Sequence, residues 1–140
     1  MTVKQISVFL ENKPGQLKEF AKLLDDNQIN MHAMSLADAE DFGILRIIVD
    51  DSYKTACVLK DEGYVFSITK VLAVEIPDRP GSLVKVLDIL GQNGVNLEYT
   101  YAFITRKVDL AYMIFRVPDN EKAIEVLSNC LLYTSDAADD

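Results

Sequence analysis

The sequence predicts an α+β fold of two tandem βαββαβ units, each an antiparallel sheet with both helices on one face. The motif Asn12-Lys13-Pro14-Gly15-Gln16-Leu17 returns 66 residues later as Asp78-Arg79-Pro80-Gly81-Ser82-Leu83. Each copy follows a stretch of alternating apolar residues and precedes apolar residues at helical spacing. Each copy therefore predicts a strand, a tight turn and a helix. A repeat this regular indicates two copies of one structural unit.

The elements of the first unit follow from local patterns. Asp51 or Ser52 caps its second helix, and Gly63 ends that helix. Its first helix has apolar residues at positions i, i+3, i+4 and i+7, on one face: Leu17, Phe20, Ala21 and Leu24. The predicted elements are strand Gln5–Leu10, helix Gln16–Asp26, strands Asn30–Leu36 and Ile44–Val49, a helix to Glu62, and strand Tyr64–Ile68.

The second unit repeats this order. The same helical spacing recurs at Leu83, Val86, Leu87 and Leu90. The predicted elements are strand Val71–Ile76, helix Ser82–Gly91, strands Asn96–Ile104 and Leu110–Val117, and helix Asn120–Ser128. Only Thr69-Lys70 separates the units, too little for a flexible linker. We therefore place the first unit at residues 1–69 and the second at residues 70–129. Antiparallel sheets with helices on one face are typical of ferredoxin-like folds.

The last eleven residues, 130–140, need a separate interpretation. Their sequence resembles the translation of a transposase-type sequencing-library adapter. We therefore expect the natural chain to depart from this sequence near Asn129, and the second unit to lack its final strand. The alternative is a genuine acidic tail that is disordered at its end.

Composition restricts the possible partners. The chain is 49% hydrophobic and 26% charged, which is typical of a globular protein. A net charge of −8 argues against nucleic acid or an anionic membrane as partner. No apolar run approaches the ~18 residues of a membrane span, and no signal peptide is evident. Cys57 and Cys130 provide neither a disulfide framework nor metal-ligand spacing. We expect a cytoplasmic protein without metal or cofactor.

The two turns have the chemistry of an anion site. The short side chain of Asn12 or Asp78 is expected to accept hydrogen bonds from the first N–H groups of the helix. Gly15 and Gly81 have no Cβ that would block approach to the backbone. The result is a helix N-terminus suited to a carboxylate. The alternative is that the polar residue only caps the helix and nothing binds.

Taken together, these motifs resemble the ACT domain, a small regulatory module that binds amino acids. The resemblance rests on an apolar strand, the turn Asn/Asp-x-Pro-Gly-x-Leu, an apolar helix, and Ile/Val-Asn before the next strand. It covers Lys4–Asn129 as two copies with no catalytic domain attached. It implies a stand-alone tandem ACT protein that binds a free amino acid, acts allosterically and forms a homodimer.

The resemblance also implies the ligand-binding residues. In serine-regulated ACT domains the asparagine of the turn and the asparagine that opens the second strand contact the ligand, and backbone N–H groups of the turn hold its carboxylate. In this sequence the histidine that family members carry two residues before the turn is replaced by Leu10 and Ile76, which favours a branched-chain or aromatic amino acid over serine. The implied ligand-binding residues are Asn12, Pro14, Gly15 and Asn30 in the first unit and Asp78, Pro80, Gly81 and Asn96 in the second.

Other candidate residues leave alternatives open. Tyr99, Tyr101 and Phe103 share one face of a strand and either pack on the sheet or a dimer partner, or form a pocket wall. Cys57 is expected to be a small buried residue. The sequence contains no catalytic acid–base pair, nucleophile motif or phosphate-binding loop, so we expect no enzyme. The rival function is a module that assembles partner subunits and binds no ligand.

Overall fold

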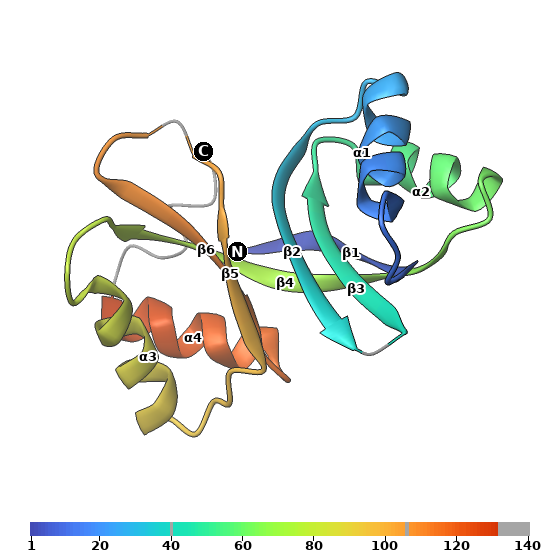
Figure 1. Ribbon diagram of the computed structural model, residues 1–140. Helices are drawn as coiled ribbons and strands as arrows, with labels where there is room; N and C mark the ends of the chain where they lie inside the picture. The colour runs from blue at the N-terminus through green and yellow to red at the C-terminus, as the bar shows by residue number, and fades with distance from the viewer. Residues whose placement is uncertain (40, 106, 132–140) are drawn as a thin grey trace. The chain divides into compact units, whose positions relative to one another are not determined.

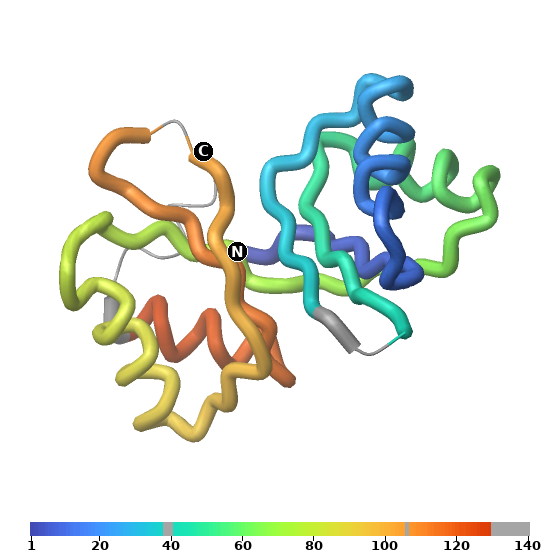
Figure 2. The backbone as a smooth tube through the Cα atoms, viewed as in Figure 1, coloured from blue at the N-terminus to red at the C-terminus, as the bar shows by residue number. Residues whose placement is uncertain are grey.

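The computed structural model describes residues 1–39, 41–105 and 107–131. The chain divides into two compact units, and each is described by itself. The first unit comprises residues 4–69, and the second comprises residues 70–140 together with residues 1–3. Figure 2 traces the backbone through both units.

The first unit is a four-stranded sheet with two helices on one side. Strand β3 pairs antiparallel with both β1 and β2, and the strand order is β2-β3-β1-β4. Helices α1 and α2 lie on the same side of this sheet (Figure 1). The elements are β1 (Thr2–Glu11), α1 (Gln16–Asp26), β2 (Met31–Ala39), β3 (Phe42–Val49), α2 (Ser52–Asp61) and the start of β4 (Val65–Pro77).

The core of the first unit lies between this sheet and its helices. Alternate residues of β1 point to the helices, and Ile6 and Val8 are fully buried there. Phe20 of α1 is also fully buried. The ring of Tyr64 meets the ring of Phe20 edge-on, with centroids 5.4 Å apart. The buried residues of β1 and the apolar face of α1 therefore pack against each other.

The second unit repeats this architecture. Strand β6 pairs antiparallel with the second half of β4 and with β5. Leu72 and Val74 of β4 and Val86 and Leu90 of α3 are buried in one cluster. The further elements are α3 (Ser82–Gln92), β5 (Tyr99–Phe103), β6 (Leu110–Arg116) and α4 (Asn120–Leu131). The predicted α+β fold of two tandem ferredoxin-like units is confirmed.

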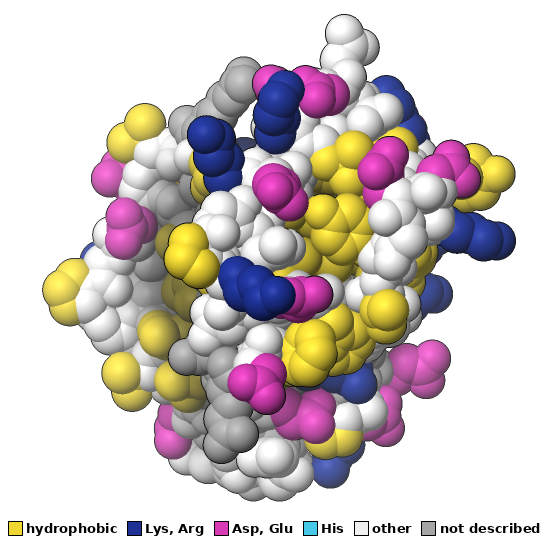
Figure 3. All heavy atoms as spheres, turned by 45° about the vertical axis from the view of Figure 1, so that its right-hand side comes forward, with side chains coloured by type: hydrophobic (Ala, Val, Ile, Leu, Met, Phe, Trp, Pro, Cys, Tyr) yellow, Lys and Arg dark blue, Asp and Glu magenta, His cyan; other side chains and the backbone are white. Residues whose placement is uncertain are grey.

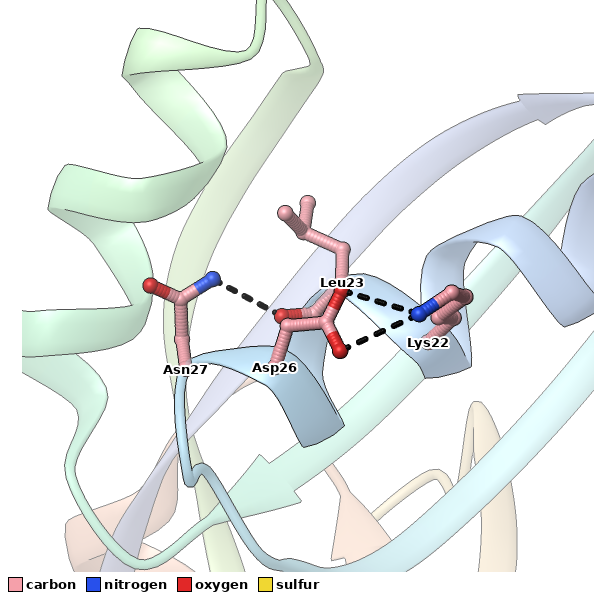
Figure 4. Close-up of polar contacts among 4 residues, drawn as sticks. All are labelled: Lys22, Leu23, Asp26 and Asn27. Carbon is pink, nitrogen blue, oxygen red and sulfur yellow. Dashed lines mark hydrogen bonds and ion pairs between the residues drawn. The ribbon is translucent and has the colours of Figure 1, made fainter.

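The repeat extends to the ends of the helices. At the end of α1 the side-chain amide of Asn27 donates to the carbonyl of Leu23 at 2.8 Å (Figure 4), and Asn93 donates to Ile89 at the same distance after α3. Each carbonyl also accepts the backbone N–H of the same asparagine, at 3.2 Å for Leu23 and 3.3 Å for Ile89, so the side chain adds a second hydrogen bond at the helix end. An exposed ion pair, Lys22 with Asp26 at 3.2 Å, also lies on the last turn of α1.

Several predicted boundaries were wrong, and the largest differences lie in β4, β5 and α4. Residues 65–77 form one strand, β4, and not two strands separated by Thr69-Lys70. Neither Thr69 nor Lys70 interrupts a strand, and β-branched threonine favours extended backbone. Strand β5 covers only 99–103 of the predicted 96–104, and α4 continues to Leu131, beyond the predicted end at Ser128.

Two predictions of burial were also wrong. Cys57 is exposed. The buried residues of α2 are Thr55 and Leu59. Cys57 lies two positions from each of them, and residues two apart in a helix point to opposite faces. Leu87 is 37% exposed because the buried stripe of α3 consists of Val86 and Leu90.

The surface carries charges of both signs. On the face drawn in Figure 3, acidic and basic side chains are scattered around groups of hydrophobic ones. Within residues 1–39, 41–105 and 107–131, no helix is both long and apolar enough to cross a membrane.

Candidate functional site

Each Pro-Gly turn places a glycine, not Asn12 or Asp78, at the N-cap of its helix. Gly15 has φ +86° and Gly81 has φ +90°, and neither helix start has a side-chain cap. The predicted capping by Asn12 and Asp78 was therefore wrong. The reason is that the N-cap lies three residues after the polar residue, at a position whose left-handed backbone favours glycine.

The turns leave the start of each helix accessible. The first intrahelical bond of α1 runs from Glu19 N–H to the Gly15 carbonyl at 3.0 Å, and the first of α3 runs from Lys85 to Gly81 at 3.2 Å. N–H groups before that bond have no partner within the helix. A Cβ added at Gly15 or Gly81 would find no atom within 4 Å. Space beside both glycines is therefore open, while the first N–H of each helix, Gln16 or Ser82, already donates to the carbonyl of Lys13 or Arg79 at 3.3 and 3.2 Å.

The polar residue of each turn ties the turn to the neighbouring hairpin. The backbone N–H of Asn12 donates to the carbonyl of Asp41 at 2.9 Å. The N–H of Asp78 donates to the carbonyl of Asp109 at 2.7 Å. Asp41 lies between β2 and β3, and Asp109 between β5 and β6. In both units the turn is therefore held against the connection between the two strands that follow its helix.

A small hollow lies beside the first turn, and we call it the first-turn hollow. Its volume is about 80 Å³. Lys13 and Glu11 form an ion pair beside it, with Nζ and Oε2 2.7 Å apart. The hydrogen bond to Glu11 raises the pKa of Lys13. Three leucines combine with polar residues to line the hollow: Leu10, Glu11, Asn12, Lys13, Gln16, Leu17, Leu36 and Gly43.

The hollow beside the second turn, the second-turn hollow, has a different lining. It includes two cationic side chains, Arg79 and Lys85, and no leucine. Ala102, the counterpart of Leu36 in the repeat, is exposed and does not line it. The complete lining is Pro77, Arg79, Pro80, Gly81, Ser82 and Lys85. The backbone of the turn is thus repeated while the adjoining side chains are not.

Asn30 and Asn96 lie away from the turns of their own units. Asn30 follows α1, and an 11-residue helix is about 16 Å long, so Asn12 and Asn30 lie at opposite ends of it. The N–H of Asn30 donates to Asp50 Oδ1 at 3.2 Å. Asn96 occupies the corresponding position between α3 and β5 and is exposed. A single unit therefore does not bring its two predicted ligand residues together.

The sequence analysis did not identify the part of the first-turn hollow that strands β2 and β3 form. Gly43 lies opposite Leu10 in the β1–β3 register. A Cβ at Gly43 would lie 3.1 Å from Cδ1 of Leu36, so Leu36 packs closely over the glycine. A glycine inside a strand often marks such a close approach, and that signal was available in the sequence. Its counterpart in the second unit is Ala111.

The aromatic row of β5 is separate from both hollows. The rings of Tyr99 and Tyr101 stack with centroids 6.4 Å apart, and Phe103 lies 5.5 Å from Tyr112. None of the three residues of the row lines either hollow. Among the described residues, no group of three histidine, cysteine or acidic side chains is arranged to hold a metal ion.

Comparison with known proteins gives a family and a fold. The sequence model of the ACT domain pair matches residues 1–138. The search of curated proteins gives no match. The crystal structure of protein BT0572 from Bacteroides thetaiotaomicron is 42% identical, with a TM-score of 0.85, over 92% of this chain and 88% of that one.

More distant structures share the fold alone. The regulatory subunit of aspartate kinase from Thermus thermophilus, in its ligand-free form, has a TM-score of 0.62 at 14% identity, over 90% of each chain. The corresponding subunit from Thermus flavus has a TM-score of 0.59 at 15% identity, again over 90% of each chain.

Proposed function

Because the chain belongs to the family of ACT domain pairs, we propose that it is a regulatory protein that binds a free amino acid and catalyses no reaction of its own. Two structures that share its fold are regulatory subunits of aspartate kinase, which supports a regulatory role. The observation that carries the proposal is the first turn, where an accessible helix start adjoins a hollow lined by three leucines.

The ligand's three parts match three features of this turn. The carboxylate faces the helix N–H groups that follow Gln16, where the helix dipole is positive, while Lys13 is already paired with Glu11. The ammonium faces Asn12, whose side-chain carbonyl is an acceptor. The side chain enters the hollow beside Leu17 and Leu36. An apolar lining stabilises a branched-chain or aromatic side chain and offers no partner to the hydroxyl of serine.

The rest of the site comes from a second copy of the chain. A hollow of about 80 Å³ encloses only part of an amino acid. Strand β2 lies at the edge of its sheet, and among the described residues it pairs only with β3. Antiparallel pairing of β2 with its copy would set Met31 of one chain near the far end of β2 in the other. Asn30 of one protomer would thus lie beside the far end of β2 in its partner, close to Asp41, whose carbonyl holds the first turn. We therefore propose a homodimer.

The second turn is a candidate for a separate, more polar site. Asp78 replaces the asparagine there, and an ionised carboxylate suits an ammonium but repels a carboxylate. Arg79 and Lys85 supply positive charge. Pro80 and Gly81 repeat the turn, and Asn96 repeats the position of Asn30. We propose that this turn binds an apolar amino acid more weakly than the first turn does.

The alternative is an interaction module that binds no ligand. Met34 and Leu36 on the edge strand are 44% and 51% exposed, as expected of a surface that pairs with another subunit. A thermal-shift panel of the twenty amino acids separates the two functions. A ligand at 100 times its dissociation constant should add about 2.7 kcal/mol of stability. If no amino acid raises the melting temperature, the interaction module is favoured.

A further inference from the structure

Of the three leucines that line the first-turn hollow, only Leu36 lies outside the core. Leu10 is buried in the core cluster of the first unit, and Leu17 packs against that cluster. Leu36 lies on edge strand β2 and is 51% exposed. Its partner across the β2–β3 pair is the buried core residue Leu45, so Leu36 stands on the helix side of the sheet. The size of the hollow can therefore change at Leu36 without a change in the core.

Gly43 allows Leu36 to lie close to the sheet. A Cβ added at Gly43 would lie 3.1 Å from Cδ1 of Leu36. Carbon atoms in ordinary contact are about 3.5–4.0 Å apart, so a methyl group at this position would push Leu36 away. Gly43 is not among the glycines with a positive φ, so its backbone conformation does not require glycine. The glycine instead provides the space that Leu36 occupies.

The second unit does not repeat this pair of residues. By strand register, Ala111 stands at the position of Gly43 and Ala102 at the position of Leu36. Neither alanine lines the second-turn hollow. A large side chain packed over a glycine is therefore a feature of the first turn, where it contributes a wall of the leucine-lined hollow.

The volume of the first-turn hollow restricts the size of a ligand side chain. The hollow has a volume of about 80 Å³. An apolar protein cavity of about 150 Å³ accepts benzene, so the hollow is too small for an aromatic ring. The isopropyl or isobutyl group of a branched-chain amino acid is smaller than a ring and is apolar throughout. Such a group therefore matches both the volume and the lining.

We propose that Leu36, packed over Gly43, sets the size limit of the first-turn hollow and restricts the ligand to an amino acid with a branched aliphatic side chain. The inference rests on the proposed binding of a free amino acid at the first turn, and narrows it by excluding aromatic ligands. The terminal methyl groups of the ligand pack on the isobutyl group of Leu36. The ring of phenylalanine meets Leu36 before the ligand's carboxylate reaches the N–H groups that follow Gln16.

Titration calorimetry with leucine and phenylalanine on wild type and Leu36→Ala tests the proposal. Wild type should bind leucine about 10-fold or more tightly than phenylalanine, since small differences in fit to an apolar pocket change affinity by about 10- to 200-fold. Leu36→Ala should bring the two affinities close together, because the ring then enters the hollow. The ratio of the two affinities is insensitive to a loss common to both ligands, such as weaker pairing of β2 with a second copy.

Gly43→Ala tests the same size limit in the opposite direction. The added methyl group lies beside the hollow and displaces Leu36, so leucine should bind about 10-fold or more weakly than it does to wild type. Valine is one methylene group shorter and should lose less affinity.

Met34→Ala is the matched control for Leu36→Ala. Met34 lies two residues before Leu36, on the same face of β2, and is exposed to a similar degree. It does not line the hollow. Met34→Ala should therefore leave the ratio of leucine to phenylalanine affinity as it is in wild type.

The outcomes separate this proposal from the proposed function. If wild type binds no amino acid, the proposed function is wrong and the size limit is wrong with it. If wild type binds phenylalanine as tightly as leucine, or if Leu36→Ala keeps the wild-type ratio or Met34→Ala changes it equally, only the size limit is overturned. Should Leu36→Ala not fold, Leu36→Val replaces it, and an unchanged ratio in that variant contradicts the proposal.

Discussion

The two Pro-Gly turns have the same backbone and different surroundings. Gly15 and Gly81 have nearly equal φ angles and both lack a side-chain cap. The first turn adjoins three leucines and the second adjoins two cations. Backbone geometry in the repeat follows from a few residues, glycine above all. The chemistry beside the turn depends on side chains from other strands, which are free to differ. The comparison therefore separates the residues that set the backbone of each unit from the side chains that would contact a ligand.

The largest difference between the units should appear in their cores. Phe20→Ala removes a ring that is fully buried and touches Tyr64, and should destabilise the protein by about 3–5 kcal/mol. Val86→Ala at the equivalent position removes less surface and should cost about 1.5–3 kcal/mol. Urea unfolding monitored by circular dichroism measures both values, with exposed Lys18→Ala as a control near zero. A larger loss for Val86→Ala than for Phe20→Ala would contradict this description of the cores.

The two turns should respond equally to loss of glycine. A side chain at positive φ costs about 1–2 kcal/mol, and neither site has atoms within 4 Å that would add a clash. Gly15→Ala and Gly81→Ala should therefore destabilise the protein by similar amounts. Asparagine tolerates this conformation better, so Gly15→Asn and Gly81→Asn are matched controls with smaller losses. Unequal losses at the two glycines would mean that the turns differ in backbone strain.

The smallest effects should come from the caps of the other two helices. Asp51 accepts from the Lys54 N–H at 2.9 Å, and Asp119 accepts from the Lys122 N–H at 3.2 Å. Asp51→Ala and Asp119→Ala should each cost about 1 kcal/mol. Asp51→Asn and Asp119→Asn keep an acceptor oxygen and should cost less. If alanine and asparagine have equal effects at either position, the cap contributes nothing to stability there.

Local sequence patterns predicted the helices and strands. The features that they missed depend on contacts between residues that are distant in the sequence. Helix α1 begins and ends at the predicted residues, because apolar spacing and the Pro-Gly turn act locally. The continuity of β4 through Thr69 and Lys70 was missed, since no residue there favours or excludes a turn. The first-turn hollow was missed because Leu36 and Gly43 reach it through the register of a hairpin. Helical length explains why Asn12 and Asn30, 18 residues apart, lie far from one another.

The most direct test of the proposed ligand site is titration calorimetry with leucine, phenylalanine and serine on folded wild type, Asn12→Ala and Asp78→Ala. We predict that wild type binds leucine or phenylalanine more tightly than serine. Asn12→Ala should weaken that binding by about 10- to 150-fold, because the ligand's ammonium loses a charge-assisted hydrogen bond of about 1.5–3 kcal/mol. Asp78→Ala should leave it nearly unchanged. Equal affinity of wild type and Asn12→Ala, or a loss confined to Asp78→Ala, would contradict a ligand site at the first turn.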